Sequence, residues 1–295
     1  MTDLPNMKIW ALAPWAGAKR NLASAIVALL GRHNAYWEPF AGGAAILLAK
    51  EPSRIEVIND LHRDLINMAH IIQDPILGPK LYRRLRRTLF SQDFHREVLE
   101  QLENETDPLE RAYCYFVKAW QSWGGVAGTT RGGSKMSIRY TNNGGYQAKR
   151  FASAVESIPA WRRRLRNVTI LNMDAFELIP KIEDAPNVVI YCDPVYIENN
   201  VGYEHDFLPI DHIRLAQILH RFKRARIVLS YYDHPALDDL YPDWTKRKIE
   251  VTKSLTQIGK RGSYRQRAVE VLLVNQQVDG MGLFEDFATI ERGQS

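Results

Sequence analysis

The sequence has few cysteines, no long apolar run and no grouped histidines. Only Cys114 and Cys192 occur among the 295 residues, so one disulfide could form, but two reduced thiols in a cytoplasmic protein are the expectation. No apolar run reaches the ~20 residues that cross a bilayer, and residues 1–10 lack the basic-then-apolar pattern of a signal peptide. The eight histidines show no metal-ligand spacing. We therefore predict neither a metal site nor a membrane attachment.

Positive charge is concentrated in one part of the chain. Residues 61–166 contain 18 of the 39 Lys and Arg residues and 10 of the 34 Asp and Glu residues, a net charge of +8 in a chain whose total is +5. The densest clusters are LYRRLRRTLF (81–90) and WRRRLR (161–166). A localised basic surface is typical of a protein that binds a polyanion, because each cation placed against a phosphate releases counterions. The alternative is a solvated helix face.

Short segments rich in Val and Ile alternate with amphipathic segments. Apolar strands that alternate with helices are typical of a mainly parallel sheet covered on both faces. The helices between the strands include residues 44–50 and 211–222. The predicted strands are residues 35–40, 54–60, 167–172, 187–193, 226–233 and 268–275.

The alternation stops between the second and third predicted strands. Residues 64–72, 107–123 and 151–166 have helical patterns, and residues 124–146 form a loop with seven of the chain's 18 glycines. We predict an α/β domain formed by residues 1–63 and 167–295. Residues 64–166 are then an inserted, mainly helical lobe.

Glycines and acidic residues follow several predicted strands, where open α/β sheets bind their ligands. EPFAGGAAILL (38–48) runs from a strand through two glycines into a helix, but it is neither G-x-G-x-x-G nor a phosphate loop. Asp60 ends the next strand and suits a ribose, since a carboxylate accepts hydrogen bonds from both hydroxyls. Asp174 could accept from an adenine amine. Each carboxylate could instead cap the helix that follows it.

YCDPVY (191–196) ends an apolar strand with a carboxylate, a proline and a tyrosine. This arrangement suits a planar aromatic amine, whose lone pair is delocalised into the ring. The Asp193 carboxylate and the Pro194 carbonyl would accept its two hydrogens, draw electron density toward the nitrogen and favour a tetrahedral geometry. Proline fixes the backbone that carries this carbonyl, and Tyr196 can stack on the base.

The chain resembles the DNA adenine-N6 methyltransferases of the Dam type in five segments, which occur in the same order as in that family. The resemblance covers most of the chain outside residues 124–146. YCDPVY is similar to the D-P-P-Y motif of that family, and the glycine loop is similar to its glycine motif. The other three similar segments are PWAGAKR (14–20), VINDLHRDLIN (57–67) and LSYYDH (229–234).

The resemblance implies a Rossmann-like methyltransferase fold with a mainly parallel sheet and an antiparallel last strand. It implies transfer of a methyl group from S-adenosylmethionine to the N6 amine of adenine in double-stranded DNA, without a metal, leaving S-adenosylhomocysteine. Asp193, Pro194 and Tyr196 match the catalytic motif. The cofactor-binding positions that we predict are Trp15, Lys19, Glu38, Phe40, Gly42, Asp60, Asp174 and Asp193.

The inserted lobe is the predicted DNA-binding part. We expect Arg162 and Arg163 to contact phosphates, and Arg131, Lys135 and Arg139 in the glycine-rich loop to read bases. The chain departs from the family at Val195, which replaces the second proline of D-P-P-Y, and at Ala18, where glycine is frequent. A non-catalytic DNA-binding derivative, or an enzyme acting on cytosine or RNA amines, is the alternative. The target sequence and any protein partner stay open.

Overall fold

The computed structural model describes residues 11–15, 17, 19–122, 127–128, 136, 147–197, 205, 207–252 and 267–276. Within these residues seven strands form one sheet in the order β3-β2-β1-β4-β5-β7-β6. The strands are β1 (Ala35–Glu38), β2 (Ile55–Asn59), β3 (Thr169–Leu171), β4 (Val188–Cys192), β5 (Arg226–Tyr232), β6 (Thr245–Thr252) and β7 (Arg267–Val274).

Strands β1 to β5 are parallel to one another, and β7 is antiparallel to both β5 and β6. This arrangement confirms the predicted fold class, including the antiparallel last strand. All six predicted strands are present, and β6 is an additional strand that was not predicted. Its sequence, TKRKIEVT, has three consecutive cations, a composition typical of an edge strand that must resist pairing with other chains.

Helices cover both faces of the sheet, as the continuous burial of β4 requires. Val189 and Tyr191 pack with α1 and α2, whereas Ile190 and Cys192 pack with α8, α9 and α10 on the other face. Short 3-10 segments, η1 (Lys19–Leu22) and η2 (Ile179–Lys181), precede α1 and follow α8. The helices around the sheet are α1 (Ala23–Leu30), α2 (Ala45–Ala49), α8 (Ala175–Leu178), α9 (Pro209–Leu219) and α10 (Ala236–Leu240).

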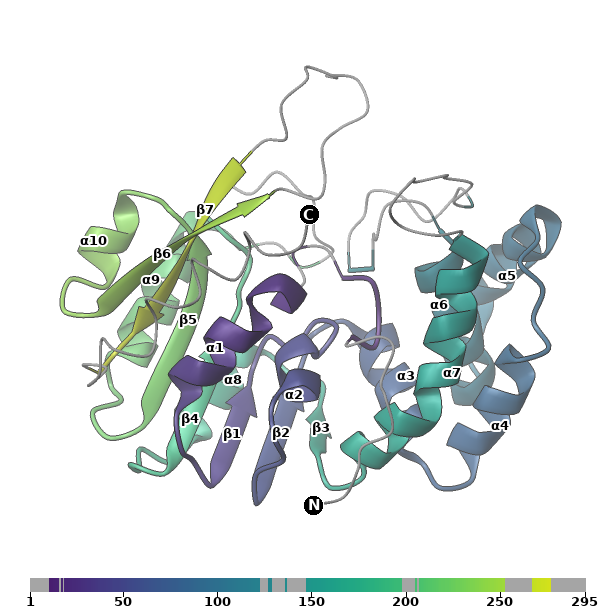
Figure 1. The fold of residues 1–295 in the computed structure, drawn as a ribbon, viewed down its shortest axis with the longest axis horizontal. Helices are drawn as coiled ribbons and strands as arrows, with labels where there is room; N and C mark the ends of the chain where they lie inside the picture. The colour runs from purple at the N-terminus through teal and green to yellow at the C-terminus, as the bar shows by residue number, and fades with distance from the viewer. Residues whose placement is uncertain are drawn as a thin grey trace, which may run out of the picture.

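Between β2 and β3 the described residues form helices and, apart from isolated bridges at Ser122, Ala127 and Met136, no strand. Figure 1 shows these helices gathered at the β3 end of the molecule, on the side away from β5, β6 and β7. They include the predicted helical segments and add two that were not predicted, α4 and α5. They are α3 (Arg63–Gln73), α4 (Leu77–Leu85), α5 (Gln92–Asn104), α6 (Pro108–Gln121) and α7 (Gln147–Leu165).

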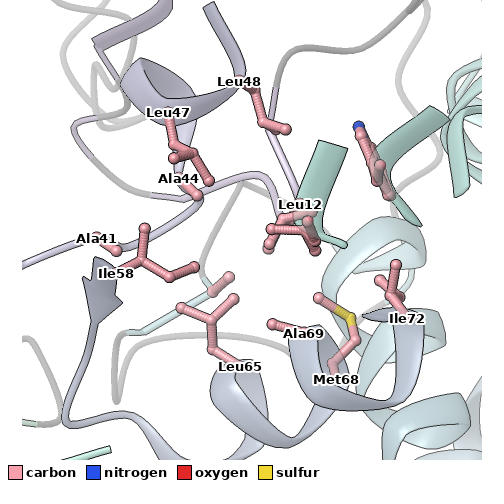
Figure 2. Close-up of a cluster of buried hydrophobic side chains, with 14 of the residues drawn as sticks. Leu12, Ala41, Ala44, Leu47, Leu48, Ile58, Leu65, Met68, Ala69 and Ile72 are labelled. Carbon is pink, nitrogen blue, oxygen red and sulfur yellow. The ribbon is translucent and has the colours of Figure 1, made fainter. Parts of the chain in front are cut away.

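One buried cluster continues from the sheet into these helices. Figure 2 shows Leu65, Met68 and Ile72 of α3 directed toward Leu12 and toward the helix that carries Leu47. The same cluster extends to Trp161 of α7. Helices α3–α7 therefore share a core with the sheet, and the division into two domains stays a prediction.

Two expectations from composition concern thiols and membrane spans. Cys114 and Cys192 are both free and buried, so the expectation of two unpaired thiols is confirmed. Among the described residues, no helix has both the length and the apolar character needed to cross a bilayer.

Candidate active site

The glycine loop after β1 joins three of the predicted cofactor residues. Gly42 has φ 47°, and an added Cβ would come within 2.8 Å of the Trp15 ring. This position therefore favours glycine for its backbone and for its space. The Gly42 N–H donates to Oδ2 of Asp60 at 2.8 Å. Trp15, Gly42 and Asp60 thus meet where β1 and β2 end.

Asp60 accepts hydrogen bonds from the backbone N–H groups of two segments, the glycine loop and the residues just before α3. Its Oδ1 accepts a hydrogen bond from the His62 N–H at 2.9 Å. His62, and not Asp60, is the N-cap of α3, because its Nδ1 accepts from the Leu65 N–H at 3.2 Å. Burial raises the pKa of Asp60, and the bonds from His62 and Gly42 oppose that rise. Each carboxylate oxygen has lone pairs beyond these bonds, so Asp60 can still accept from a ligand.

Two other predicted cofactor residues have local roles in this structure. Oδ1 of Asp174 accepts from the Phe176 N–H at 2.8 Å and caps α8, as the alternative interpretation of that residue had it. Glu38 is buried and accepts from the Tyr36 hydroxyl at 2.9 Å, and burial raises its pKa to about 8. Their contacts with a cofactor stay predictions.

Phe40, another predicted cofactor residue, is half-buried after β1. Its ring packs edge-on against that of Phe207, with centroids 5.7 Å apart, and Phe207 in turn contacts Phe176 of α8. This aromatic group lines the edge of the sheet between the glycine loop and the start of α9. A cofactor contact of Phe40 stays a prediction.

Lys19 reaches the residue that follows β4. Its Nζ lies 3.0 Å from Oδ2 of Asp193 and donates to the Gly17 carbonyl at 2.6 Å. Burial lowers the pKa of Lys19, but Asp193 and Glu270 more than offset this, so the pKa lies above its ordinary value. The lysine is therefore charged and orients one oxygen of Asp193.

The other oxygen of Asp193 is left open. Oδ1 is buried and has no hydrogen-bond partner among the described residues. Burial raises the pKa of Asp193, while Lys19 and the nearby Tyr196 hydroxyl oppose that rise. An unsatisfied buried acceptor is costly, so its presence indicates a place where a ligand donates.

Tyr196 is buried beside this carboxylate. Its ring packs edge-on against that of Tyr232, with centroids 4.6 Å apart. Nζ of Lys19 lies 4.8 Å from the centroid of the Tyr196 ring. The Tyr196 hydroxyl donates to Oε2 of Glu270 at 3.3 Å. Glu270 is not among the residues predicted from the sequence, although a glutamate in the apolar segment AVEVLLV was a signal that could have identified it.

Comparison with known proteins agrees with this geometry. Residues 15–258 match the family model of the D12 class N6 adenine-specific DNA methyltransferases. That range holds the glycine loop, Asp60, Lys19 and the Asp-Pro-Val-Tyr segment.

The chain belongs to this family of enzymes.

Two relatives of this D12-class methyltransferase align along nearly the whole chain. Type II methyltransferase M1.LlaDCHI of Lactococcus lactis subsp. cremoris is 24% identical, over 88% of this chain and 93% of its own. The retron Ec67 DNA adenine methylase of Escherichia coli is also 24% identical, over 88% of this chain and 90% of its own. Among solved structures, that of SMU.472 complexed with S-adenosylhomocysteine matches with a TM-score of 0.38 and 13% identity, covering 90% of this chain and 55% of SMU.472.

Two of the predicted DNA-binding residues of this methyltransferase, Arg162 and Arg163, lie away from this site. Helix α7 ends at Leu165 and β3 begins at Thr169, so Arg162 and Arg163 lie where the parallel strands begin, whereas Asp193 follows the end of β4. Figure 1 shows α7 leading down to the start of β3. The predicted phosphate contacts of these two arginines gain no support from this position.

Three further predicted DNA contacts belong to the glycine-rich loop. Arg131, Lys135 and Arg139 lie outside the described residues. Their proposed role in reading bases therefore stays a prediction.

Proposed function

We propose that this D12-class enzyme methylates the N6 amine of an adenine in double-stranded DNA, with Asp193 as the residue that accepts from the amine. The observation that carries the proposal is the buried, unpartnered Oδ1 of Asp193 beside Lys19 and Tyr196. An acceptor held open in this way suits a ligand that brings a hydrogen-bond donor, such as the N–H of an amine.

The residues of the site fit S-adenosylmethionine as the methyl donor. Gly42 leaves room for the backbone to approach a ligand, and Asp60, fixed by the Gly42 and His62 N–H groups, keeps lone pairs for ribose hydroxyls. Trp15 packs on the same loop. When bound, S-adenosylmethionine supplies an electrophilic methyl group.

Asp193 and Pro194 then prepare the adenine amine. Oδ1 of Asp193 and the Pro194 carbonyl accept its two hydrogens, which draws its lone pair out of the ring and toward the methyl donor. Lys19 holds Oδ2 of Asp193, so the carboxylate cannot rotate away. Tyr196 offers its ring to the base. Orientation and fixed electrostatics supply the catalysis, as expected where the described residues of the site include no strong base.

The position that we favour for the DNA duplex is the end of the sheet at which the parallel strands finish, the same end as Asp193. Arg20 is exposed directly after Lys19, and the Arg150 guanidinium lies 5.5 Å from the Trp120 ring near the start of α7. Burial and then the charge of Arg20 lower the pKa of Arg150, as expected for two cations that lie close together. Among the described residues neither arginine has an acidic partner within ion-pair distance. Two unpaired guanidiniums suit a phosphate.

The experiment uses the full chain with labelled S-adenosylmethionine and four substrates: duplex DNA, its separated strands, the same duplex with adenines replaced, and RNA. Nucleoside analysis should find N6-methyladenine, and label should enter the duplex far faster than the other substrates. Asp193→Asn, which keeps size but loses charge, should reduce the rate on the order of 10²–10³-fold. Label in cytosine or in RNA, or a fully active Asp193→Asn variant, would contradict the proposal.

A further inference from the structure

Glu270 is a buried carboxylate to which the proposed mechanism assigns no role. It lies in β7, opposite Tyr232 of β5 and Ile249 of β6, and only 7% of its surface is exposed. Burying a carboxylate in a strand of apolar residues is costly unless the group has a specific partner. The partner found in the structure is the Tyr196 hydroxyl.

Tyr196 has one proton to donate and two carboxylates nearby. Burial, Asp193 and Glu270 together raise the pKa of Tyr196 well above its ordinary value, so its hydroxyl stays protonated. The hydroxyl is within hydrogen-bonding reach of Asp193, and this interaction helps to lower the pKa of that carboxyl. Its hydrogen bond nevertheless goes to Oε2 of Glu270 at 3.3 Å. Oδ1 of Asp193 stays without a donor.

We propose that Glu270 is a positioning residue, which holds the Tyr196 hydroxyl so that Oδ1 of Asp193 remains open to the substrate amine. Since a hydroxyl donates one hydrogen bond, a Tyr196 directed at Asp193 would occupy the oxygen that the amine needs. This inference rests on the proposed function, since it assigns a supporting role to a residue of that same site. Glu270 itself touches neither the amine nor the methyl group.

The arrangement makes the step sensitive to pH. Burial raises the pKa of Glu270 to about 7, and Lys19 opposes that rise while Asp193 adds to it. Tyr232 is the titratable neighbour on β5. On β6 the paired residue, Ile249, is uncharged, and Arg247 is the charged residue two positions along that strand.

Protonation of Glu270 gives it an O–H of its own. A protonated Glu270 donates to the Tyr196 oxygen, which releases the Tyr196 hydroxyl toward Asp193. We therefore expect the maximal rate to fall as the pH decreases through about 7, the value to which burial raises the pKa of Glu270.

Glu270→Gln tests the inference because an amide resembles the protonated carboxyl. Single-turnover rates with saturating duplex DNA and S-adenosylmethionine should fall about 10²-fold at high pH, with both KM values unchanged. The rate step near pH 7 should vanish. In a Tyr196→Phe background, which lacks the hydroxyl, Glu270→Gln should cause no further loss. If the glutamine variant does not fold, Tyr196→Phe alone decides, because the pH step must disappear with the hydroxyl.

Thermal unfolding without DNA or cofactor gives a readout that is independent of turnover. A folded-state pKa raised from 4.5 to about 7 stabilises the protein at low pH, and this contribution is lost as the pH rises through about 7. Glu270→Gln should remove that part of the pH dependence. A variant with the wild-type rate and pH profile, or equal losses with and without the Tyr196 hydroxyl, would overturn the inference. A wild-type enzyme that methylates no adenine would overturn the proposed function instead.

Discussion

Nζ of Lys19 lies 3.0 Å from Oδ2 of Asp193, so a residue from the start of the chain fixes the carboxylate that follows β4. The ion pair leaves the other oxygen of that carboxylate free, and both side chains are largely buried. Lys19, predicted from the sequence to contact the cofactor, is thus also the ion-pair partner of the carboxylate to which we assign the substrate amine. Its removal should change the ionisation of the site as well as its shape.

Lys19→Gln should move the acid limb of the activity profile to higher pH. Burial already raises the pKa of Asp193, and Lys19 is the main group that opposes this, so its loss raises the pKa further. In the proposed mechanism methylation needs ionised Asp193, so activity should be lost as the pH falls through this pKa. The measurement is kcat/KM against pH. Lys19→Arg is the control because it retains the charge, and an unshifted profile in Lys19→Gln would contradict the assignment.

Asp60→Ala should weaken S-adenosylmethionine binding more than DNA binding. The change removes the acceptor of the Gly42 and His62 N–H groups together with the proposed ribose acceptor. We expect a loss of about 1–3 kcal/mol in cofactor binding, measured by calorimetry. Asp174→Ala, which removes a carboxylate that caps α8, is the comparison at the neighbouring strand end. Unchanged cofactor affinity in Asp60→Ala would leave that residue a purely structural role.

Salt dependence should separate the two groups of arginines. Arg20→Gln with Arg150→Gln should flatten the plot of log affinity against log salt by about 0.9 for each lost phosphate contact. Arg162→Gln with Arg163→Gln should leave the slope unchanged, because these residues lie where the parallel strands begin. The opposite result would indicate that DNA binds at the end of the sheet at which the parallel strands begin.

Arg164→Met should destabilise the fold without a specific effect on DNA. Arg164 is buried, ion-paired with Glu56 and hydrogen-bonded to the Leu47 carbonyl at 2.9 Å, while Lys50 holds the same glutamate. Breaking a buried ion pair of this kind costs about 3–5 kcal/mol of unfolding free energy. Arg163→Met, at the exposed neighbouring position, should change it by less than about 0.5 kcal/mol. Denaturant unfolding of the two variants makes the comparison, and equal values would contradict it.

The three arginines at 162–164 show that the sequence alone does not predict the surroundings of each side chain. They form one basic cluster in the sequence, yet Arg162 is half-buried, Arg163 is exposed and Arg164 is buried. Successive residues on a helix are about 100° apart, so three neighbours necessarily face three environments. Whether an arginine meets solvent, backbone or Glu56 depends on what packs against α7, and the sequence does not state that.

The buried strands were easier to predict than the surroundings of these arginines, because a buried strand consists mainly of apolar residues. β4 is entirely buried and consists of Val, Ile, Tyr and Cys, and the carboxylate and proline that follow it mark its end. The strand β6 is polar and lies at the sheet edge, so its pattern carried no such signal. Glu270 was missed for a related reason, since its importance comes from contact with Tyr196, which is far away in the sequence.

The position of β7 has a consequence for synthesis of the chain. β7 lies between β5 and β6, and β6 pairs with β7 alone. A nascent chain that has emerged only through residue 252 therefore has a strand with no neighbour to pair with. The missing strand also carries Glu270, which holds Tyr196. The sheet can therefore close, and Glu270 can reach Tyr196, only after residues 267–274 have left the ribosome.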